Sequence, residues 1–172
     1  MTIDMHAHWS PPELIDIYRA RTSPAMIYAN NSGEEVIKTR RGEQPFDGMF
    51  DHLGTRLAEM DKHGVTTGVL SLWGPHQWIE RLPVEESVAA VKIFNDAVSK
   101  LCAQHPGRFI AYASLPQADM QAAVAELDRA MAMPGMIGAI VPGNAFMTLA
   151  DTDAYRPLLA AANRHRAGLF IH

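Results

Sequence analysis

Five short apolar runs alternate with helical segments along this 172-residue chain, and that alternation limits the possible folds more than any other feature. The expected strands are residues 2–8, 65–72, 108–115, 136–141 and 168–172. The expected helices are residues 10–21, 51–63, 84–105, 119–131 and one that begins at 151. Strands that are apolar throughout, each followed by an amphipathic helix, predict a parallel sheet of βαβ units.

Local signals support these boundaries. Ser10 is expected to cap the first helix, with Pro11 in its first turn, and Asp119 is expected to cap the helix that follows it. Residues 24–45 interrupt the alternation, because two short apolar runs flank the turn sequence Asn30-Asn31-Ser32-Gly33. We expect a small β-hairpin excursion there, within a single domain that spans residues 1–172.

Two arrangements fit five parallel strands: an open doubly wound sheet or a (β/α)₈ barrel. A barrel takes about 250 residues, so this chain would supply about five of its eight strands. An open five-stranded sheet fits the length better. However, the sequence lacks the nucleotide-binding signatures common in open sheets, because it contains neither Gly-x-Gly-x-x-Gly nor a P-loop pattern.

Composition narrows the class of partner. A formal net charge of −4 gives no electrostatic reason to expect nucleic acid or an anionic membrane. No apolar run approaches the roughly 20 residues of a membrane helix, and no secretory leader is visible. The single cysteine, Cys102, excludes an internal disulfide. The cytoplasm is therefore the expected location.

The chemistry lies at the strand ends. His6 and His8 are two residues apart on the first strand, so both side chains point to one side, and His172 ends the fifth strand. Parallel sheets gather functional groups at the carboxyl ends of their strands. Three imidazoles there suit one divalent ion, with Zn²⁺ as the expected metal and a carboxylate as a further ligand. The alternative is that the histidines are structural and hydrogen-bonded.

Several segments together resemble the amidohydrolase superfamily, in the branch that includes aminocarboxymuconate semialdehyde decarboxylase. The matching segments occur in family order across the whole chain: Ile3 to His8, Arg56 to Val65, Pro106 to Phe109, Leu115 to Asp119, Gly138 to Asn144, and Phe170 to His172. The resemblance implies a barrel fold of which this chain is the N-terminal part. It also implies that His6, His8 and His172 are metal ligands.

The family's remaining site residues have no match here. The resemblance implies a base histidine after the sixth strand and a ligating aspartate after the eighth, both expected beyond His172. Relatives with two metals bridge them with a lysine or glutamate after the fourth strand. Residues 136–144 contain neither, so one ion is expected.

The resemblance implies a lyase that removes CO₂ from an unsaturated or aromatic acid, in a protein that is a homodimer when intact. An amide or lactone hydrolase of the same family is the alternative, as is an inactive fragment that acts only as a binding module. A small anionic substrate would meet residues in the loops at the catalytic face. The candidates are Trp73, His76, Asn144 and Arg41, or the neighbouring Arg40. Asp4, below the ligands, could orient one of them.

Overall fold

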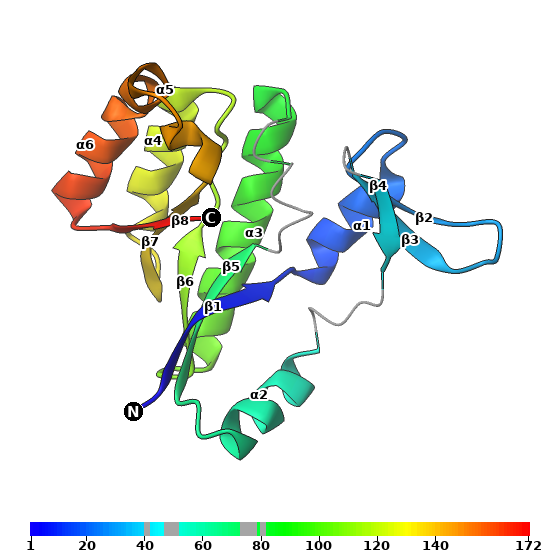
Figure 1. Cartoon of the computed structure of the whole chain (residues 1–172). Coiled ribbons are helices and arrows are strands. Elements are labelled where there is room, and N and C mark those ends of the chain that lie inside the picture. Colours follow the sequence, from blue (N-terminus) through cyan, green and yellow to red (C-terminus); the bar gives the residue numbers. More distant parts are fainter. Residues whose placement is uncertain (40–41, 47–51, 73–78, 80–81) are drawn as a thin grey trace.

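A parallel sheet of five strands forms the centre of the molecule (Figure 1). The computed structural model describes residues 1–39, 42–46, 52–72, 79 and 82–172. The strands are β1 (Ile3–Trp9), β5 (Thr67–Leu72), β6 (Phe109–Ala113), β7 (Met136–Val141) and β8 (Gly168–Ile171). All four pairings between neighbouring strands are parallel, as the sequence predicts.

The strand order separates the two expected architectures. It runs β1-β5-β6-β7-β8, so each strand pairs with the next parallel strand along the chain and β1 lies at an edge. A doubly wound sheet would instead place its first strand inside, with the order reversing there. Continuous order is that of a (β/α)₈ barrel, and the chain forms five of its strands. The open-sheet alternative is therefore wrong.

Helices cover one face of this sheet, which we call the outer face. They are α1 (Pro12–Ala20), α2 (Leu53–Lys62), α3 (Val84–Gln104), α4 (Met120–Ala130) and α6 (Arg156–His165). The short helix α5 (Leu149–Ala154) packs on α6 and buries none of its residues. Leu70 and Leu72 of β5 point into the large core beneath the helices. Val69, which precedes Leu70, points to the opposite inner face, where it packs with Tyr112 and Ile140. This alternation is the two-residue period of a strand with both faces apolar.

The excursion is a separate antiparallel sheet beside α1 (Figure 1). The expected hairpin is present as β2 (Met26–Ala29) and β3 (Glu35–Thr39). A third strand that the sequence did not indicate, β4 (Gly42–Pro45), pairs with β3 and is exposed along its length. Its Gly and Pro residues carry little strand propensity, so pairing with β3 decides its conformation.

Two helix ends differ from expectation. Ser10 does not cap α1: Pro11 occupies the cap position, and the buried Ser10 hydroxyl has no hydrogen-bond partner among the described residues. The helix expected from residue 151 is split at Tyr155 into α5 and α6, because Pro157 lies in the first turn of α6 and lacks an N–H to continue α5. Asp119 caps α4 as predicted, its Oδ1 accepting from the Ala122 N–H at 2.9 Å.

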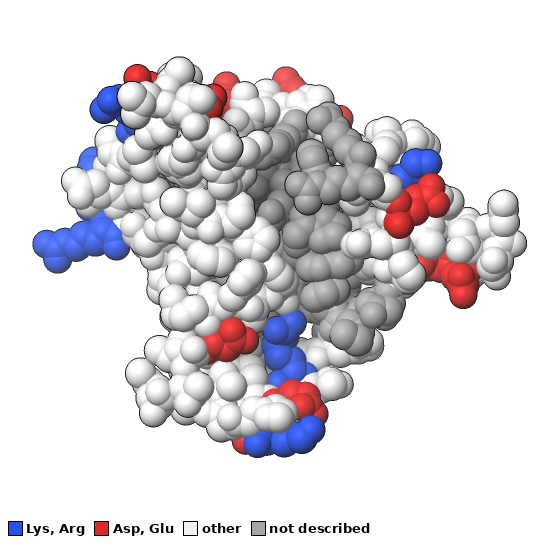
Figure 2. Space-filling view, viewed as in Figure 1, with Lys and Arg blue, Asp and Glu red and all other residues white. Residues whose placement is uncertain are grey.

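Charged side chains of both signs are interspersed around the rim of the face in Figure 2. The helices within the described ranges are all too short or too polar to cross a membrane.

A buried polar network fixes the carboxyl end of β6. Asn95 of α3 is fully buried, and its Oδ1 accepts from the Ser114 N–H at 2.9 Å. Its Nδ2 donates to the Ser114 carbonyl at 2.9 Å and to Glu126 Oε1 at 2.7 Å. Arg129 neutralises Glu126 through a hydrogen bond of 2.7 Å and reaches Asp96 at 2.6 Å. Side chains of α3 and α4 thus hold the backbone where β6 ends.

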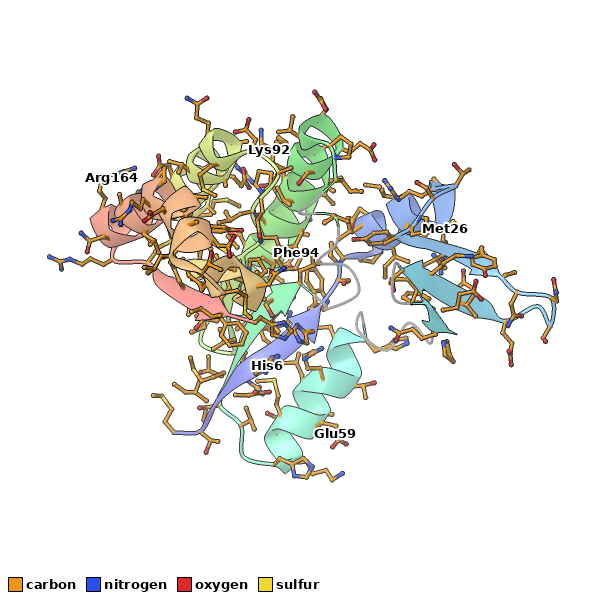
Figure 3. All side chains as sticks on the ribbon, turned by 45° about the horizontal axis from the view of Figure 1, so that its top comes forward. His6, Met26, Glu59, Lys92, Phe94 and Arg164 are labelled. Atoms are coloured by element: carbon orange, nitrogen blue, oxygen red, sulfur yellow. The ribbon has the colours of Figure 1, made fainter. Side chains whose placement is uncertain are left out.

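We expect the substitution Asn95→Ala to lower the free energy of unfolding by about 3 kcal/mol, because it removes the side-chain partner of the Ser114 N–H and carbonyl and one of the donors to the buried Glu126. The matched control is Lys92→Ala on the exposed side of α3 (Figure 3), expected to change stability by less than about 0.5 kcal/mol. Urea unfolding followed by circular dichroism measures both. Equal, small effects would show that the network contributes nothing to stability.

Candidate metal centre

Three imidazoles meet at the carboxyl ends of β1 and β8. His6, labelled in Figure 3, and His8 lie on β1, and His172 directly follows β8. The Nε2 atom of His6 is 3.0 Å from Nε2 of His8 and 3.0 Å from Nε2 of His172. All three nitrogens lie within 4.8 Å of one another. Residues at the two ends of the sequence therefore form one cluster of nitrogen donors.

Backbone pairing places His172 in this cluster. Its N–H donates to the Val141 carbonyl at 3.0 Å, and its carbonyl accepts from the Gly143 N–H at 2.8 Å. The β7–β8 ladder thus continues one residue beyond each strand. The β1–β5 ladder in turn pairs His8 with Ser71, so both histidine-bearing strands are held by their inner neighbours.

The surroundings of His8 select its tautomer. Its Nδ1 lies 3.0 Å from the Leu72 carbonyl oxygen and 3.0 Å from the Ser71 hydroxyl. Because a carbonyl oxygen can only accept, we assign the hydrogen to Nδ1, which leaves a lone pair on Nε2. Burial lowers the pKa of His8 to about 4, and the neighbouring His6 and His172 rings act in the same direction. Burial likewise lowers the pKa of His172. At neutral pH both rings are therefore uncharged, as metal ligands must be.

Hydrogen bonding among the rings does not satisfy this geometry. A neutral His8 with its hydrogen on Nδ1 has no hydrogen on Nε2, so His6 Nε2 would have to donate to it. With that hydrogen, His6 Nε2 has no lone pair to accept a bond from His172. It could bond to His172 Nε2 only if its one hydrogen were shared between His8 and His172. A cation between the rings would accept all three lone pairs. Two nitrogens bonded to Zn²⁺ at about 2.0–2.1 Å with tetrahedral angles are about 3.4 Å apart, close to the two observed separations of 3.0 Å from His6. The donor set fits one ion.

Apolar rings lie beside the histidines on the inner face. The ring of Phe170 stacks on Tyr112 with centroids 5.3 Å apart and meets the edge of His6 at 5.2 Å. Val69 and Ile140 complete this cluster. An apolar surface next to the three nitrogens strengthens electrostatic interactions there by lowering the local dielectric constant.

The structure describes only some of the other predicted site residues. Asp4 is exposed, and its Oδ1 accepts from the His6 backbone N–H at 3.1 Å, so it contacts a histidine through the main chain and not through the ring. Asn144 is exposed in the short helix η2 (Gly143–Phe146), next to the residue that bonds His172. Trp73, His76, Arg40 and Arg41 lie outside the described residues.

Sequence reasoning missed three residues that contact His8: Ser71, Leu72 and Arg56. Arg56 Nη2 donates to the His8 carbonyl oxygen at 2.5 Å. The first two could have been found, because Ser71 and Leu72 end the strand that neighbours β1. Arg56 is 48 residues away on a helix, and no local pattern points from it to His8.

Comparison with known proteins identifies the class. Residues 3–172 match the Amidohydrolase family, so the chain belongs to that family. Among curated proteins, it is 31% identical over 131 residues to the gamma-resorcylate decarboxylase of Rhizobium radiobacter. The aligned region covers 72% of this chain and 39% of that protein. The chain thus spans less than half the length of this relative.

Solved structures agree on the fold. The IDCase of Metarhizium anisopliae in its apo form superposes with a TM-score of 0.80 at 20% identity, over 100% of this chain and 50% of that one. The dihydroxybenzoic acid decarboxylase of Polaromonas, solved with manganese and the inhibitor 2-nitroresorcinol, has a TM-score of 0.69 at 22% identity, over 99% of this chain and 48% of that one. The half-length coverage agrees with five strands of an eight-stranded barrel.

The position of His172 depends on a close approach of two glycines. Gly138 of β7 pairs with Gly168 of β8, and a Cβ on Gly138 would overlap the Gly168 backbone. We therefore expect Gly138→Ala to separate β8 from β7 and to lower the free energy of unfolding by about 3 kcal/mol. It should also weaken metal binding, because β8 carries His172.

Gly54→Ala in α2 is the matched control. No atom of the described residues lies within 4 Å of a Cβ at this position, so the substitution should be tolerated and should stabilise the helix by about 0.5 kcal/mol. Thermal melts and metal titrations of both variants provide the test. Metal affinity of Gly138→Ala equal to that of the unsubstituted protein would contradict the dependence on β8.

Proposed function

We propose that residues 1–172 form a single domain, the N-terminal part of a metal-dependent decarboxylase barrel, with the small sheet β2–β4 as an excursion. The substrate would be a small aromatic or unsaturated carboxylate. The observation that carries this proposal is the convergence of His6, His8 and His172 through Nε2 at the carboxyl ends of two strands. Barrel enzymes keep their active sites at that end.

The proposed cofactor is one divalent ion. Imidazole ligands suit Zn²⁺ and several neighbouring metals, and the manganese in the Polaromonas decarboxylase makes Mn²⁺ at least as good a candidate as Zn²⁺. When bound, such an ion supplies a Lewis acid for oxygen atoms of the substrate. Strand β7 ends at Val141, where the sequence placed it, and residues 136–144 hold no lysine or glutamate to bridge a second ion.

The residues of this chain would have distinct tasks. The three histidines hold the ion, and the Leu72 carbonyl keeps the His8 ring in the ligating tautomer. Trp73, His76, Asn144 and Arg41 are proposed to contact the substrate, with an arginine matched to its carboxylate. Loss of CO₂ leaves a carbanion that must take up a proton. The family resemblance assigns the proton donor to a histidine after the sixth barrel strand, outside these residues.

Two other functions are open. A hydrolase of the same family would use the same three ligands, so the centre itself does not distinguish it. The relative with 31% identity, a gamma-resorcylate decarboxylase, favours decarboxylation of a hydroxylated benzoate. A metal-free binding module would need the imidazoles to be satisfied by hydrogen bonds, which their geometry disfavours.

We expect His6→Ala, His8→Ala and His172→Ala each to weaken Mn²⁺ or Zn²⁺ binding at least about tenfold, because each removes one of three ligands. Calorimetric titration of the metal-stripped protein measures the affinity and the stoichiometry, expected to be one ion per chain. The control is His63→Ala, at an exposed histidine that caps the C-terminus of α2 and pairs with Glu59; it should leave binding unchanged. Failure of the unsubstituted protein to bind either metal would contradict the proposal.

The reaction class has its own test. The protein, expressed from its own gene and loaded with Mn²⁺, is incubated with γ-resorcylate and related hydroxybenzoates. We expect one CO₂ per acid consumed, with appearance of the corresponding phenol on chromatography, and loss of turnover on chelation by EDTA. Hydrolysis of amide or lactone substrates without CO₂ release would instead identify a hydrolase.

A further inference from the structure

The charged side chain of Arg56 is partly buried and forms a hydrogen bond to the backbone of a proposed metal ligand. It lies on α2, and its guanidinium donates to the carbonyl oxygen of His8 on β1. Burial lowers its pKa, and the negative charge of Asp4 acts in the opposite direction. Removing a guanidinium from water costs free energy, so its location calls for a compensating role.

The strand that Arg56 contacts is irregular at that point. Asp4 pairs with Gly68 and Ala7 pairs with Leu70, so two residues of β1, Met5 and His6, face the single residue Val69 of β5. This is a β-bulge, a feature that changes the direction of side chains and occurs beside active sites. The bulge occurs within the segment that carries both His6 and His8.

The side chain of Asp4, the residue directly before the bulge, accepts a hydrogen bond from a backbone group inside it. Its Oδ1 accepts from the His6 N–H at 3.1 Å, replacing a bond that a regular ladder would supply. Arg56 fixes the carbonyl of His8 two residues further on. The two side chains, of opposite charge, therefore hold the β1 backbone at two points, the N–H of His6 and the carbonyl oxygen of His8.

We propose that Arg56 and Asp4 are positioning residues that hold the β1 bulge in the shape that brings the Nε2 atoms of His6 and His8 together around one ion. This inference rests on the metal centre of the proposed function. It assigns to Arg56 no contact with the ion or with the substrate. Residues that orient ligands in this way typically contribute about tenfold to hundredfold in metal affinity.

A purely electrostatic role predicts the opposite sign. A guanidinium bonded to the His8 backbone would repel a divalent cation held by the imidazoles, so removing its charge without changing the backbone would tighten metal binding. A positioning role predicts weaker binding, because the ligand nitrogens lose their spacing. The direction of the change in affinity therefore separates the two roles.

The experiment is titration of the metal-stripped protein with Co²⁺, whose visible absorption reports the number and arrangement of its ligands. We expect Arg56→Met to bind Co²⁺ at least about tenfold more weakly and to show an altered visible spectrum. Arg56→Lys, which retains a cationic donor, should recover part of the affinity. Asp4→Asn keeps an oxygen acceptor for the His6 N–H and should bind better than Asp4→Ala.

The matched control is Arg156→Met, an exposed arginine of α6 that pairs with Asp153 and should bind Co²⁺ like the unsubstituted protein. Thermal melts of each metal-free variant establish that it is folded. Unchanged or tighter binding with an unchanged spectrum in folded Arg56→Met would overturn this inference alone. Absence of Co²⁺ binding in the unsubstituted protein would instead overturn the metal centre itself.

Discussion

The contact on which this structure depends is the meeting of His6 and His172, whose Nε2 atoms lie 3.0 Å apart although 166 residues separate them in sequence. Parallel pairing of β1 with β5, and of each following strand with the next, brings the carboxyl ends of all five strands to one end of the sheet. Because β1 and β8 are the two outermost strands, the sheet must also curl for these rings to meet. The glycine contact between β7 and β8, the network around Asn95 and the bulge in β1 each hold part of this end of the sheet. The fold thus positions one cluster of nitrogen donors.

The chemistry of that cluster follows from the limited capacity of an imidazole. Each ring nitrogen either donates or accepts, and the Leu72 carbonyl fixes which nitrogen of His8 carries hydrogen. Three mutually close Nε2 atoms, two of them on rings whose burial lowers the pKa, favour a cation at their centre. Membership of the Amidohydrolase family is consistent with this centre. The class of substrate that we propose follows from the similarity to a gamma-resorcylate decarboxylase that is 31% identical over 131 residues.

The sequence predicted the features that depend on local periodicity. The five parallel strands, the hairpin of β2 and β3 and the Asp119 cap are all present, because apolar spacing and turn chemistry act over a few residues. Features that depend on neighbours distant in sequence were missed: strand β4, the unsatisfied Ser10, the bulge in β1 and the contact of Arg56 with His8. The histidine pattern predicted an imidazole metal site but could not specify zinc, since imidazole serves several divalent ions.

The central claim is that His6, His8 and His172 bind one ion, and anomalous X-ray diffraction from crystals grown with Mn²⁺ tests it most directly. The account predicts a single strong anomalous peak per chain, within bonding distance of all three Nε2 atoms. A peak at another position, or imidazoles bonded to one another with no peak between them, would contradict it.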